Sequence, residues 1–291
     1  MSPKDVATED WDWQASMQAT IGLGVAGNFT GHLEQAGEAS DFRDVTVTDA
    51  KAPKGIFPFY VPAQAEHFLH RMPVSSDTLQ LGSLEEKHQI EPEVALLCDL
   101  SYQDGAICAV EPRYAMAHND CSIRREGARK ISEKKNWGPC TKGTSQQRIP
   151  IDHLSSGGVL DGYRLASFLQ RDGSIEDYGL DSPVTGYSYF GDRLIGWLVE
   201  RMNDQRDEGP LEDISRWLEV ADHPPRALIS IGATRYTEYG ETTFLAPGDT
   251  IAVILYDSQQ HDPSLIRAIA AGTEDTQLPG LSVLRQRVVP T

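Results

Sequence analysis

The sequence predicts an α+β protein that is mainly β, with a mixed β-sheet curled into a roll. Two Asp-Gly pairs, Asp104-Gly105 and Asp172-Gly173, each separate two runs of strand-forming residues. An Asp-Gly pair in that setting is a strong signal for a tight hairpin turn. Few segments have apolar residues at helical spacing, so pairs of strands joined by turns dominate the pattern.

The same reasoning places the other elements. A helix is expected over 193–202, where Leu194, Trp197, Leu198 and Met202 recur at helical spacing. A change of pattern near residues 75–83 divides the chain, so we expect an N-terminal subdomain over 1–80 and a β-roll domain over 81–291. The expected strands cover residues 45–48, 94–100, 106–110, 163–169, 174–178, 227–231 and 250–255.

Composition excludes several classes of protein. The chain has 291 residues and a formal net charge of −17, which argues against binding to nucleic acid or to anionic membranes. Four cysteines without a Cys-x-x-Cys pair are expected to be free thiols in a reducing compartment. No apolar signal region follows Met1, and no stretch approaches the roughly 20 apolar residues of a membrane span. We therefore expect a cytoplasmic protein.

A glycine-rich segment at 22–27 fits the Gly-x-Gly-x-x-Gly pattern of dinucleotide-binding folds, and Asp49 follows at the end of the next expected strand. The helix that this fold requires would meet Gly31 and Gly37, and no alternating strand and helix units follow. We interpret the glycines instead as a tight loop from Gly22 to Gly31 after a short strand at 19–23. This loop places Asn28 and His32 before a short helix, 32–36, that Gly37 stops.

Three acidic residues and one lysine form the strongest candidate site. Glu91 and Glu93 stand two positions apart, and side chains with that spacing point to the same face of a strand. A carboxylate from Asp120 would complete an all-oxygen site, which suits Mg²⁺ or Mn²⁺, with Ca²⁺ as a further candidate, better than zinc. Lys142 would add a second positive charge for an anionic substrate or intermediate. An isolated Glu-x-Glu pair is more often a solvated surface feature. The surrounding motifs therefore decide whether this pair is a metal site.

Five short segments stand in order along the chain: Gly27-Asn28-Phe29-Thr30-Gly31-His32, Glu91-Pro92-Glu93, Asn119-Asp120-Cys121-Ser122-Ile123-Arg124, Gly138-Pro139-Cys140-Thr141-Lys142-Gly143 and Pro247-Gly248-Asp249. Together they resemble the pattern of the fumarylacetoacetate hydrolase superfamily. That family has a Gly-x-Asn-Tyr-x-x-His loop, a Glu-x-Glu pair, an Asn-Asp-x-Ser-x-Arg segment, a Gly-Lys-Ser element and a Pro-Gly-Asp turn. The resemblance extends from about residue 20 to 255 and is dense only over 91–142.

The resemblance implies a β-roll domain with a smaller N-terminal part, assembled as a homodimer. It also implies Mg²⁺ or Mn²⁺ held by Glu91, Glu93 and Asp120. His32 would activate water, and Lys142 would support the substrate oxyanion. The expected reaction is cleavage of a C–C bond, by hydrolysis or decarboxylation, in a small anionic 2-oxo acid or 1,3-dicarbonyl compound. Two alternatives stay open: a hydratase, isomerase or dehydratase of the same kind, and a non-catalytic dimer that retains metal and ligand binding.

The chain departs from the family pattern at three places. Relatives often have a glutamate three residues after the loop histidine; here that position is Gln35, and Glu34, one step early, is the candidate third catalytic residue. The usual lysine-proline element lacks its lysine at 57–62, and the usual Gly-Thr-Pro loop reads Gly-Ala-Thr at 232–234. The metal site should survive these changes better than the hydrolytic step. The candidate substrate-binding residues are Asn28, Ser122, Arg124, Thr234 and Tyr236.

Other polar groups have a structural interpretation. His118 shares a strand face with Asp120 and is expected to lie in the core or behind the metal ligands. His67 and His70 lack an evident third zinc ligand, so we expect a packing or surface pair. The basic run over 124–135 is expected to be a charged, mobile loop. The alternative is that it steers anionic substrates or pairs with the acidic surface.

Overall fold

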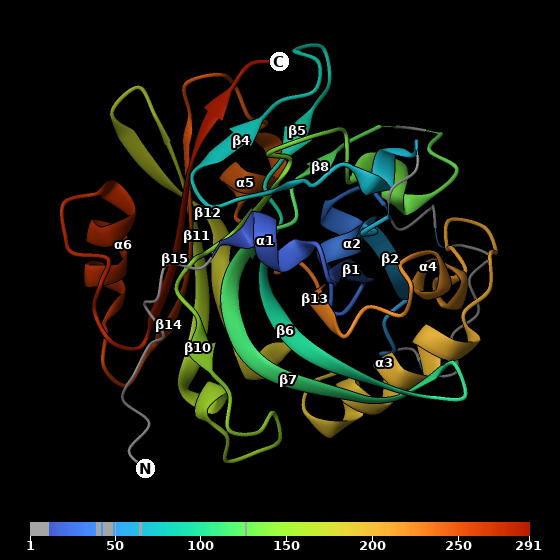
Figure 1. Ribbon diagram of the computed structural model, residues 1–291. Helices are drawn as coiled ribbons and strands as arrows, with labels where there is room; N and C mark the ends of the chain where they lie inside the picture. Colours follow the sequence, from blue (N-terminus) through green and yellow to red (C-terminus); the bar gives the residue numbers. More distant parts are fainter. Residues whose placement is uncertain (1–11, 39–41, 43–48, 50, 64–65, 126) are drawn as a thin grey trace.

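Two β-sheets form the framework of the protein (Figure 1). The structure is a computed structural model that describes residues 12–38, 42, 49, 51–63, 66–125 and 127–291. The larger sheet has eight strands in the order β2-β1-β13-β6-β7-β9-β3, with β10 also paired to β7. Its strands are β1 (Thr20–Ala26), β2 (Gly55–Tyr60), β3 (Val74–Ser75), β6 (Pro92–Gln103), β7 (Ala106–Asn119), β9 (Lys142–Thr144), β10 (Ile149–Pro150) and β13 (Arg226–Ser230).

A second sheet has five strands in the order β12-β11-β14-β15-β4, and a short ladder joins β5 to β8. These strands are β4 (Thr78–Gln80), β5 (His88–Gln89), β8 (Ser122–Ile123), β11 (Tyr163–Arg171), β12 (Ser174–Pro183), β14 (Thr250–Asp257) and β15 (Leu281–Val289). The helices are α1 (Trp13–Met17), α2 (His32–Gln35), α3 (Asp192–Asp204), α4 (Ile214–Val220), α5 (Glu238–Thr242) and α6 (Pro263–Ala271). Short 3₁₀ segments cover Phe68–His70, Ile131–Lys134, Val159–Gly162 and Val184–Gly186.

The main apolar core joins the two sheets. Leu96 of β6 and Val253 of β14 belong to one continuous cluster of buried side chains. A separate cluster contains Ile254 of β14 and Ile266 of α6, because α6 covers the outer face of the five-stranded sheet (Figure 1). The predicted class, a mainly β protein with a curled mixed sheet, is therefore confirmed.

Both predicted hairpins are present, β6–β7 and β11–β12. The two central turn residues have positive φ in each case, 53° and 82° at Asp104-Gly105 and 51° and 83° at Asp172-Gly173. Such turns match the right-handed twist of the flanking strands, which explains why Asp-Gly predicts them. The expected helix at 193–202 is confirmed as α3.

Two expectations stay predictions. The strand expected at 45–48 lies outside the described residues. The division of the chain near residue 80 is also untested, although strands β1 and β2, which precede that position, pair within the same sheet as β6 and β7. Among the described residues, no helix combines the length and apolar character needed to cross a membrane.

The glycine-rich segment corrects one prediction. Gly22 and Gly24 are residues of strand β1, which continues to Ala26, so the loop expected to begin at Gly22 was wrong. A Cβ at Gly24 would lie 2.2 Å from the Phe57 ring, and one at Gly22 would lie 2.3 Å from the Phe59 ring. These glycines therefore make room for aromatic rings of β2. The short helix after the loop is confirmed as α2, and Gly37 follows it with a φ of 71°.

The close approach of β1 to β2 gives a stability prediction. Gly24→Ala should lower the free energy of unfolding by about 1–3 kcal/mol, because the new methyl group forces the Phe57 ring out of its place. Gly196→Ala is the matched control, since a Cβ added at this exposed position of α3 would meet no atom within 4 Å. The control should raise stability by roughly 0.5–1 kcal/mol. Urea denaturation followed by circular dichroism measures both; wild-type stability in Gly24→Ala would contradict the packing argument.

A buried carboxyl group near α4 gives a pH prediction. Glu212 accepts a hydrogen bond from Ser132 Oγ at 2.8 Å, and its other oxygen has no hydrogen-bond partner among the described residues. Burial raises the pKa of Glu212 to about 7, although the Ser132 hydrogen bond and the charge of Lys130 lower it. The folded state therefore keeps a proton that the unfolded state loses near its ordinary pKa. This contribution to stability is complete at low pH and is lost as the pH rises through about 7.

Glu212→Gln should remove that pH dependence. The free energy of unfolding of the variant, relative to wild type, should increase by about 1–3 kcal/mol between pH 5 and pH 8. Urea denaturation at the two pH values measures the difference. Glu219→Gln, at an exposed position of α4, is the control and should show no such increase. An equal pH dependence in wild type and Glu212→Gln would show that Glu212 titrates normally.

Candidate functional site

Three carboxylates meet where the β6–β7 hairpin opens. Glu93 lies in β6 and pairs in register with His118 of β7. One step further, Asp120 N donates to the carbonyl of Glu91 at 3.0 Å, so the two strand ends stay joined. Ligand oxygens of Glu91, Glu93 and Asp120 lie within 4.8 Å of one another, and all three residues are buried. We call this group the carboxylate cage.

Lys142 enters the carboxylate cage from β9. This strand pairs with β7 beside Asn119, which brings the fully buried Lys142 to the end of the hairpin. Its Nζ lies 2.9 Å from Asp120 Oδ1 and donates to the carbonyl of Cys121 at 2.5 Å. Burial lowers the pKa of Lys142, and the charge of Asp120 counteracts that change. The sequence placed this residue correctly beside the acidic group.

A second lysine also lies in the cage. Lys135 follows the 3₁₀ segment Ile131–Lys134, and its Nζ lies 2.6 Å from Glu91 Oε2 and 2.5 Å from Asp120 Oδ2. Its ammonium also lies 5.0 Å from the centre of the Phe57 ring. Burial alone would lower the pKa of Lys135, but the charges of Asp120 and Glu91 outweigh it and raise the pKa above its ordinary value. The ammonium therefore stays charged at neutral pH.

Arg124 connects the cage to an outer layer. Its Nη1 lies 2.8 Å from Glu91 Oε1 and 2.8 Å from Glu38 Oε1. Its Nη2 donates to Tyr236 Oη at 2.8 Å, and its Nε donates to Gln89 Oε1 at 2.6 Å. All its nitrogens are thus engaged, which makes Arg124 a fixed brace between the cage, the segment after α2 and the loop before α5.

Among the described residues, the charges of the cluster balance. When every group is ionised, four carboxylates of the described part of the chain face four cations and leave no net charge among them. Burying this many charges is tolerable only because each is paired or hydrogen-bonded. The members are Glu38, Glu91, Glu93 and Asp120 on one side and Arg124, Lys134, Lys135 and Lys142 on the other.

The two glutamates of the Glu-x-Glu pair have pKa values moved in opposite directions. Burial raises the pKa of both, but Lys135 and Arg124 hold the pKa of Glu91 well below its usual range. Glu93 instead has its pKa raised well above that range by burial and by the charge of Asp120. The amide of Gly232 donates to Glu93 Oε2 at 2.7 Å. An added positive charge would therefore stabilise the ionised form of Glu93, because the neighbouring cations do not hold its pKa below the usual range as Lys135 and Arg124 do for that of Glu91.

His32 is the first residue of α2, and its ring faces the cage. Its Nδ1 lies 2.9 Å from the carbonyl oxygen of Thr234. A carbonyl oxygen only accepts, so Nδ1 carries the hydrogen and Nε2 carries the lone pair. This Nε2 lies 4.0 Å from Glu91 Oε1. Burial lowers the pKa of His32, although the charge of Glu91 raises it, so the ring is a neutral base at neutral pH.

Gln35 has a structural role in place of the family's glutamate. Its Oε1 accepts from Tyr236 N at 3.0 Å, and its Nε2 donates to Tyr236 O at 3.2 Å. This two-point contact holds the loop that carries Thr234 against α2. The carbonyl of Thr234 thereby reaches His32, so a backbone group orients the ring.

The remaining predicted site residues lie in different environments. Glu34 is exposed on α2, outside the cluster of buried charges. Asn28 is buried and braces the loop, because its amide donates to the carbonyls of Tyr189 and Ile231. Ser122 Oγ donates to the carbonyl of Asp120 at 3.3 Å. Substrate binding by Asn28, Ser122, Arg124, Thr234 and Tyr236 stays a prediction.

Sequence reasoning missed three members of the cluster and misread one segment. Glu38 follows α2 and carries no motif, and Lys134 and Lys135 stood in the basic run that was expected to be a charged loop. Lys134 and Lys135 are both buried, so that expectation was wrong for them. The tight 3₁₀ segment turns both side chains inward, a geometry that no periodicity signals. The expected core role of His118 agrees with its burial and its 2.8 Å contact with Thr144 Oγ1.

The carboxylate cage fits a hard divalent cation. Its donors are all oxygens, the ligands that Mg²⁺, Mn²⁺ and Ca²⁺ prefer. Glu91 Oε1 and Asp120 Oδ1 are buried beside Arg124 and Lys142, whose nitrogens lie 2.8 and 2.9 Å away. A divalent cation in the cage would therefore share the carboxylates with these neighbouring charges.

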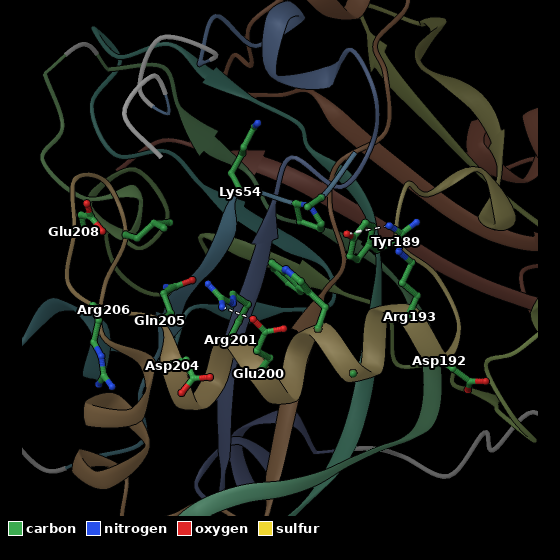
Figure 2. Close-up of a pocket in the computed structure, with 15 residues that line it drawn as sticks. Lys54, Tyr189, Asp192, Arg193, Glu200, Arg201, Asp204, Gln205, Arg206 and Glu208 are labelled. Atoms are coloured by element: carbon green, nitrogen blue, oxygen red, sulfur yellow. Dashed lines mark hydrogen bonds and ion pairs between the residues drawn. The ribbon is translucent and has the colours of Figure 1, made fainter. Parts of the chain in front are cut away.

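A separate cavity lies outside the carboxylate cage. It has a volume of about 540 Å³ and is lined by α3, including Arg193, and by residues that face this helix, such as Lys54 and Tyr189 (Figure 2). Its walls carry both acidic and basic side chains, such as Glu200 and Arg201. No member of the carboxylate cage lines it, so its size does not argue for the site.

The fold is that of the fumarylacetoacetate hydrolase superfamily. A crystal structure of Cg1458 with inhibitor matches with a TM-score of 0.54 at 14% identity, covering 94% of this chain and 78% of that one. A 2-keto-3-deoxyarabinonate dehydratase matches with a TM-score of 0.50 at 14% identity, covering 96% and 81%. A 5-carboxymethyl-2-hydroxymuconate delta-isomerase from Mycobacterium smegmatis gives 0.50 at 14% identity, covering 94% and 80%.

Sequence comparison assigns the family. Residues 38–288 match the family of unknown function DUF5718, and the chain belongs to it. No curated protein is significantly similar in sequence. At 14% identity the three solved structures support the shared fold alone, so the chemistry of this chain has to be argued from its own residues.

The paired charges predict the effect of losing one carboxylate. Asp120→Asn should lower the free energy of unfolding in the presence of chelator by about 3–5 kcal/mol, because it leaves the buried Lys135 and Lys142 without their shared partner. Asp99→Asn is the control, since Asp99 pairs with Arg113 where both side chains are about half exposed. That change should cost less than about 1 kcal/mol. Urea denaturation measures both, and similar losses would show that the cage charges are not energetically coupled.

Proposed function

We propose that this protein is a metal-dependent enzyme that stabilises the enolate of a small anionic 2-oxo acid or 1,3-dicarbonyl substrate. The observation that supports it is the buried carboxylate cage with a neutral imidazole facing it, His32 Nε2 at 4.0 Å from Glu91 Oε1. Mg²⁺ or Mn²⁺ is the proposed cofactor. A homodimer in the cytoplasm is part of the same proposal.

Positive charge is what enolate chemistry needs from the site. A divalent cation held by Glu91, Glu93 and Asp120 would supply Lewis-acid stabilisation to the substrate oxygen that gains negative charge. Lys142 contributes a fixed ammonium next to Asp120, and its bond to the Cys121 carbonyl prevents its reorientation. A preorganised donor at a developing oxyanion is worth roughly 3–4 kcal/mol.

His32 is the proposed proton acceptor. The Thr234 carbonyl fixes the tautomer, so Nε2 is available to take a proton from water or from a carbon next to a carbonyl. Burial keeps the ring neutral and thus ready to accept. Gln35 acts as a positioning residue through Tyr236, because it holds the loop that supplies the carbonyl.

Two reaction classes use these groups. The first is C–C bond cleavage by hydrolysis or decarboxylation. The second is dehydration or isomerisation. In both classes a protonated His32 would lie 4.0 Å from Glu91 Oε1, whose negative charge raises the pKa of the ring. The dehydratase and isomerase among the structures of similar fold are compatible with this second class.

One experiment tests the proposal through two variants. Calorimetric titration of chelator-stripped protein with Mn²⁺, with and without oxalate, should show metal-dependent binding of oxalate, an analogue of a 2-oxo acid enolate. Glu93→Gln should weaken Mn²⁺ binding and turnover together. His32→Ala should keep Mn²⁺ affinity and lose about 10²–10⁴-fold in kcat on whichever 2-oxo acid of a screened panel is turned over.

Glu111→Gln is the control for both variants. It changes an exposed glutamate of β7 that pairs with Arg113, and it should match wild type in all measurements. Mn²⁺ and oxalate binding without turnover of any acylpyruvate, 2-keto-3-deoxy sugar acid or oxaloacetate would favour a non-catalytic ligand-binding protein. Unchanged Mn²⁺ affinity in Glu93→Gln would remove the proposed metal site.

A further inference from the structure

Every carboxylate oxygen of Glu91 and Asp120 already lies next to a cationic nitrogen. Glu91 Oε1 lies 2.8 Å from Arg124, and Asp120 Oδ1 lies 2.9 Å from Lys142. The two other oxygens both contact Lys135, at 2.6 and 2.5 Å. Lys135 is thus the one cation in the described residues that bridges two carboxylates of the cage. Its ammonium stands where a cation shared by Glu91 and Asp120 would stand.

The three cations differ in how firmly other groups hold them. Arg124 is fixed by Glu38, Gln89 and Tyr236 in addition to Glu91. Lys142 is fixed by the Cys121 carbonyl. Within the part of the chain that the structure describes, the contacts of the Lys135 ammonium outside the cage reduce to the face of the Phe57 ring. Of the three, Lys135 would lose the fewest other contacts if its charge were replaced.

The charge balance also favours movement of one ammonium out of the cage when a metal binds. Among the described residues the cluster has four carboxylates and four cations, so a divalent cation added to these groups would create an excess of positive charge among them. Such an excess is costly in a low-dielectric interior. Movement of one ammonium out of the cage would reduce the excess, and it would also free Glu91 Oε2 and Asp120 Oδ2 for the metal.

We propose that Lys135 is the built-in counter-ion of the carboxylate cage and that a divalent metal enters by exchange with its ammonium. Lys135 thereby sets the metal affinity of the site. This inference builds on the metal site of the proposed function, but it concerns occupancy of the cage and not the reaction. It therefore holds or fails independently of whether any 2-oxo acid is turned over.

The first test compares Mn²⁺ affinity in two lysine variants. Lys135→Met keeps an unbranched side chain of similar length and removes the charge, so it should bind Mn²⁺ tighter by roughly tenfold or more. Lys134→Met is the matched control: it removes the same charge from the neighbouring buried lysine, whose Nζ lies 2.8 Å from Glu38, outside the cage. Its affinity should stay within about threefold of wild type. Calorimetry and the electron paramagnetic resonance signal of free Mn²⁺ both measure the affinity.

The same variants give a readout of stability. Without metal, Lys135→Met leaves Glu91 and Asp120 short of a partner and should unfold at a lower temperature than wild type. Saturating Mn²⁺ should raise the melting temperature of Lys135→Met more than that of wild type. Equal or weaker Mn²⁺ affinity in folded Lys135→Met would overturn the proposal. Absence of Mn²⁺ binding in both proteins would overturn it as well.

A second test needs only the wild-type chain and so does not depend on the folding of a variant. Lys135 is buried, with 3% of its surface exposed, and should react slowly with an amine-directed acylating reagent. Saturating Mn²⁺ should increase its labelling several-fold, measured by peptide mass spectrometry, if the ammonium leaves the cage. Exposed lysines such as Lys51 provide the internal reference. Unchanged labelling of Lys135 at a Mn²⁺ concentration shown to saturate the protein would exclude the exchange.

Discussion

The pairing of buried charges at the open end of the β6–β7 hairpin constrains the rest of the structure. Carboxylates and ammonium groups lose most of their hydration when buried, and only close opposite charges offset that loss. Glu91 and Asp120 come from the ends of two paired strands, whereas Lys142 and Lys135 come from β9 and from the segment after a 3₁₀ turn. Four separate parts of the chain therefore converge within ion-pair distance.

The orientation of His32 does not depend on a carboxylate at its Nδ1 atom. His32 is oriented by the backbone carbonyl of Thr234, and Gln35 fixes the loop that carries it. A side-chain carboxylate is then unnecessary for choosing the tautomer, because any acceptor at Nδ1 leaves the lone pair on Nε2. A carbonyl at Nδ1 differs from a carboxylate in one respect: it stabilises the protonated ring less.

The fold is shared with solved structures that are only 14% identical to this chain. The site is described by the contacts of this chain's own residues, among them Lys135 in the cage and the histidine oriented by a backbone carbonyl. Lys135 adds to the positive charge that the cage holds before any ligand binds, whereas burial keeps His32 neutral.

The sequence by itself determined the local features of this protein. Asp-Gly pairs specified two hairpins, because their backbone preferences match the turn, and the Glu-x-Glu spacing placed two carboxylates on one face. Only the tertiary structure decided which cations join them. Lys135 and Glu38 reach the cluster through irregular turns, where side-chain direction follows no period. Gly22 and Gly24 are strand residues, and they are glycines because aromatic rings of the neighbouring strand occupy the space of a side chain. Contacts between residues distant in sequence depend on packing, which no short motif encodes.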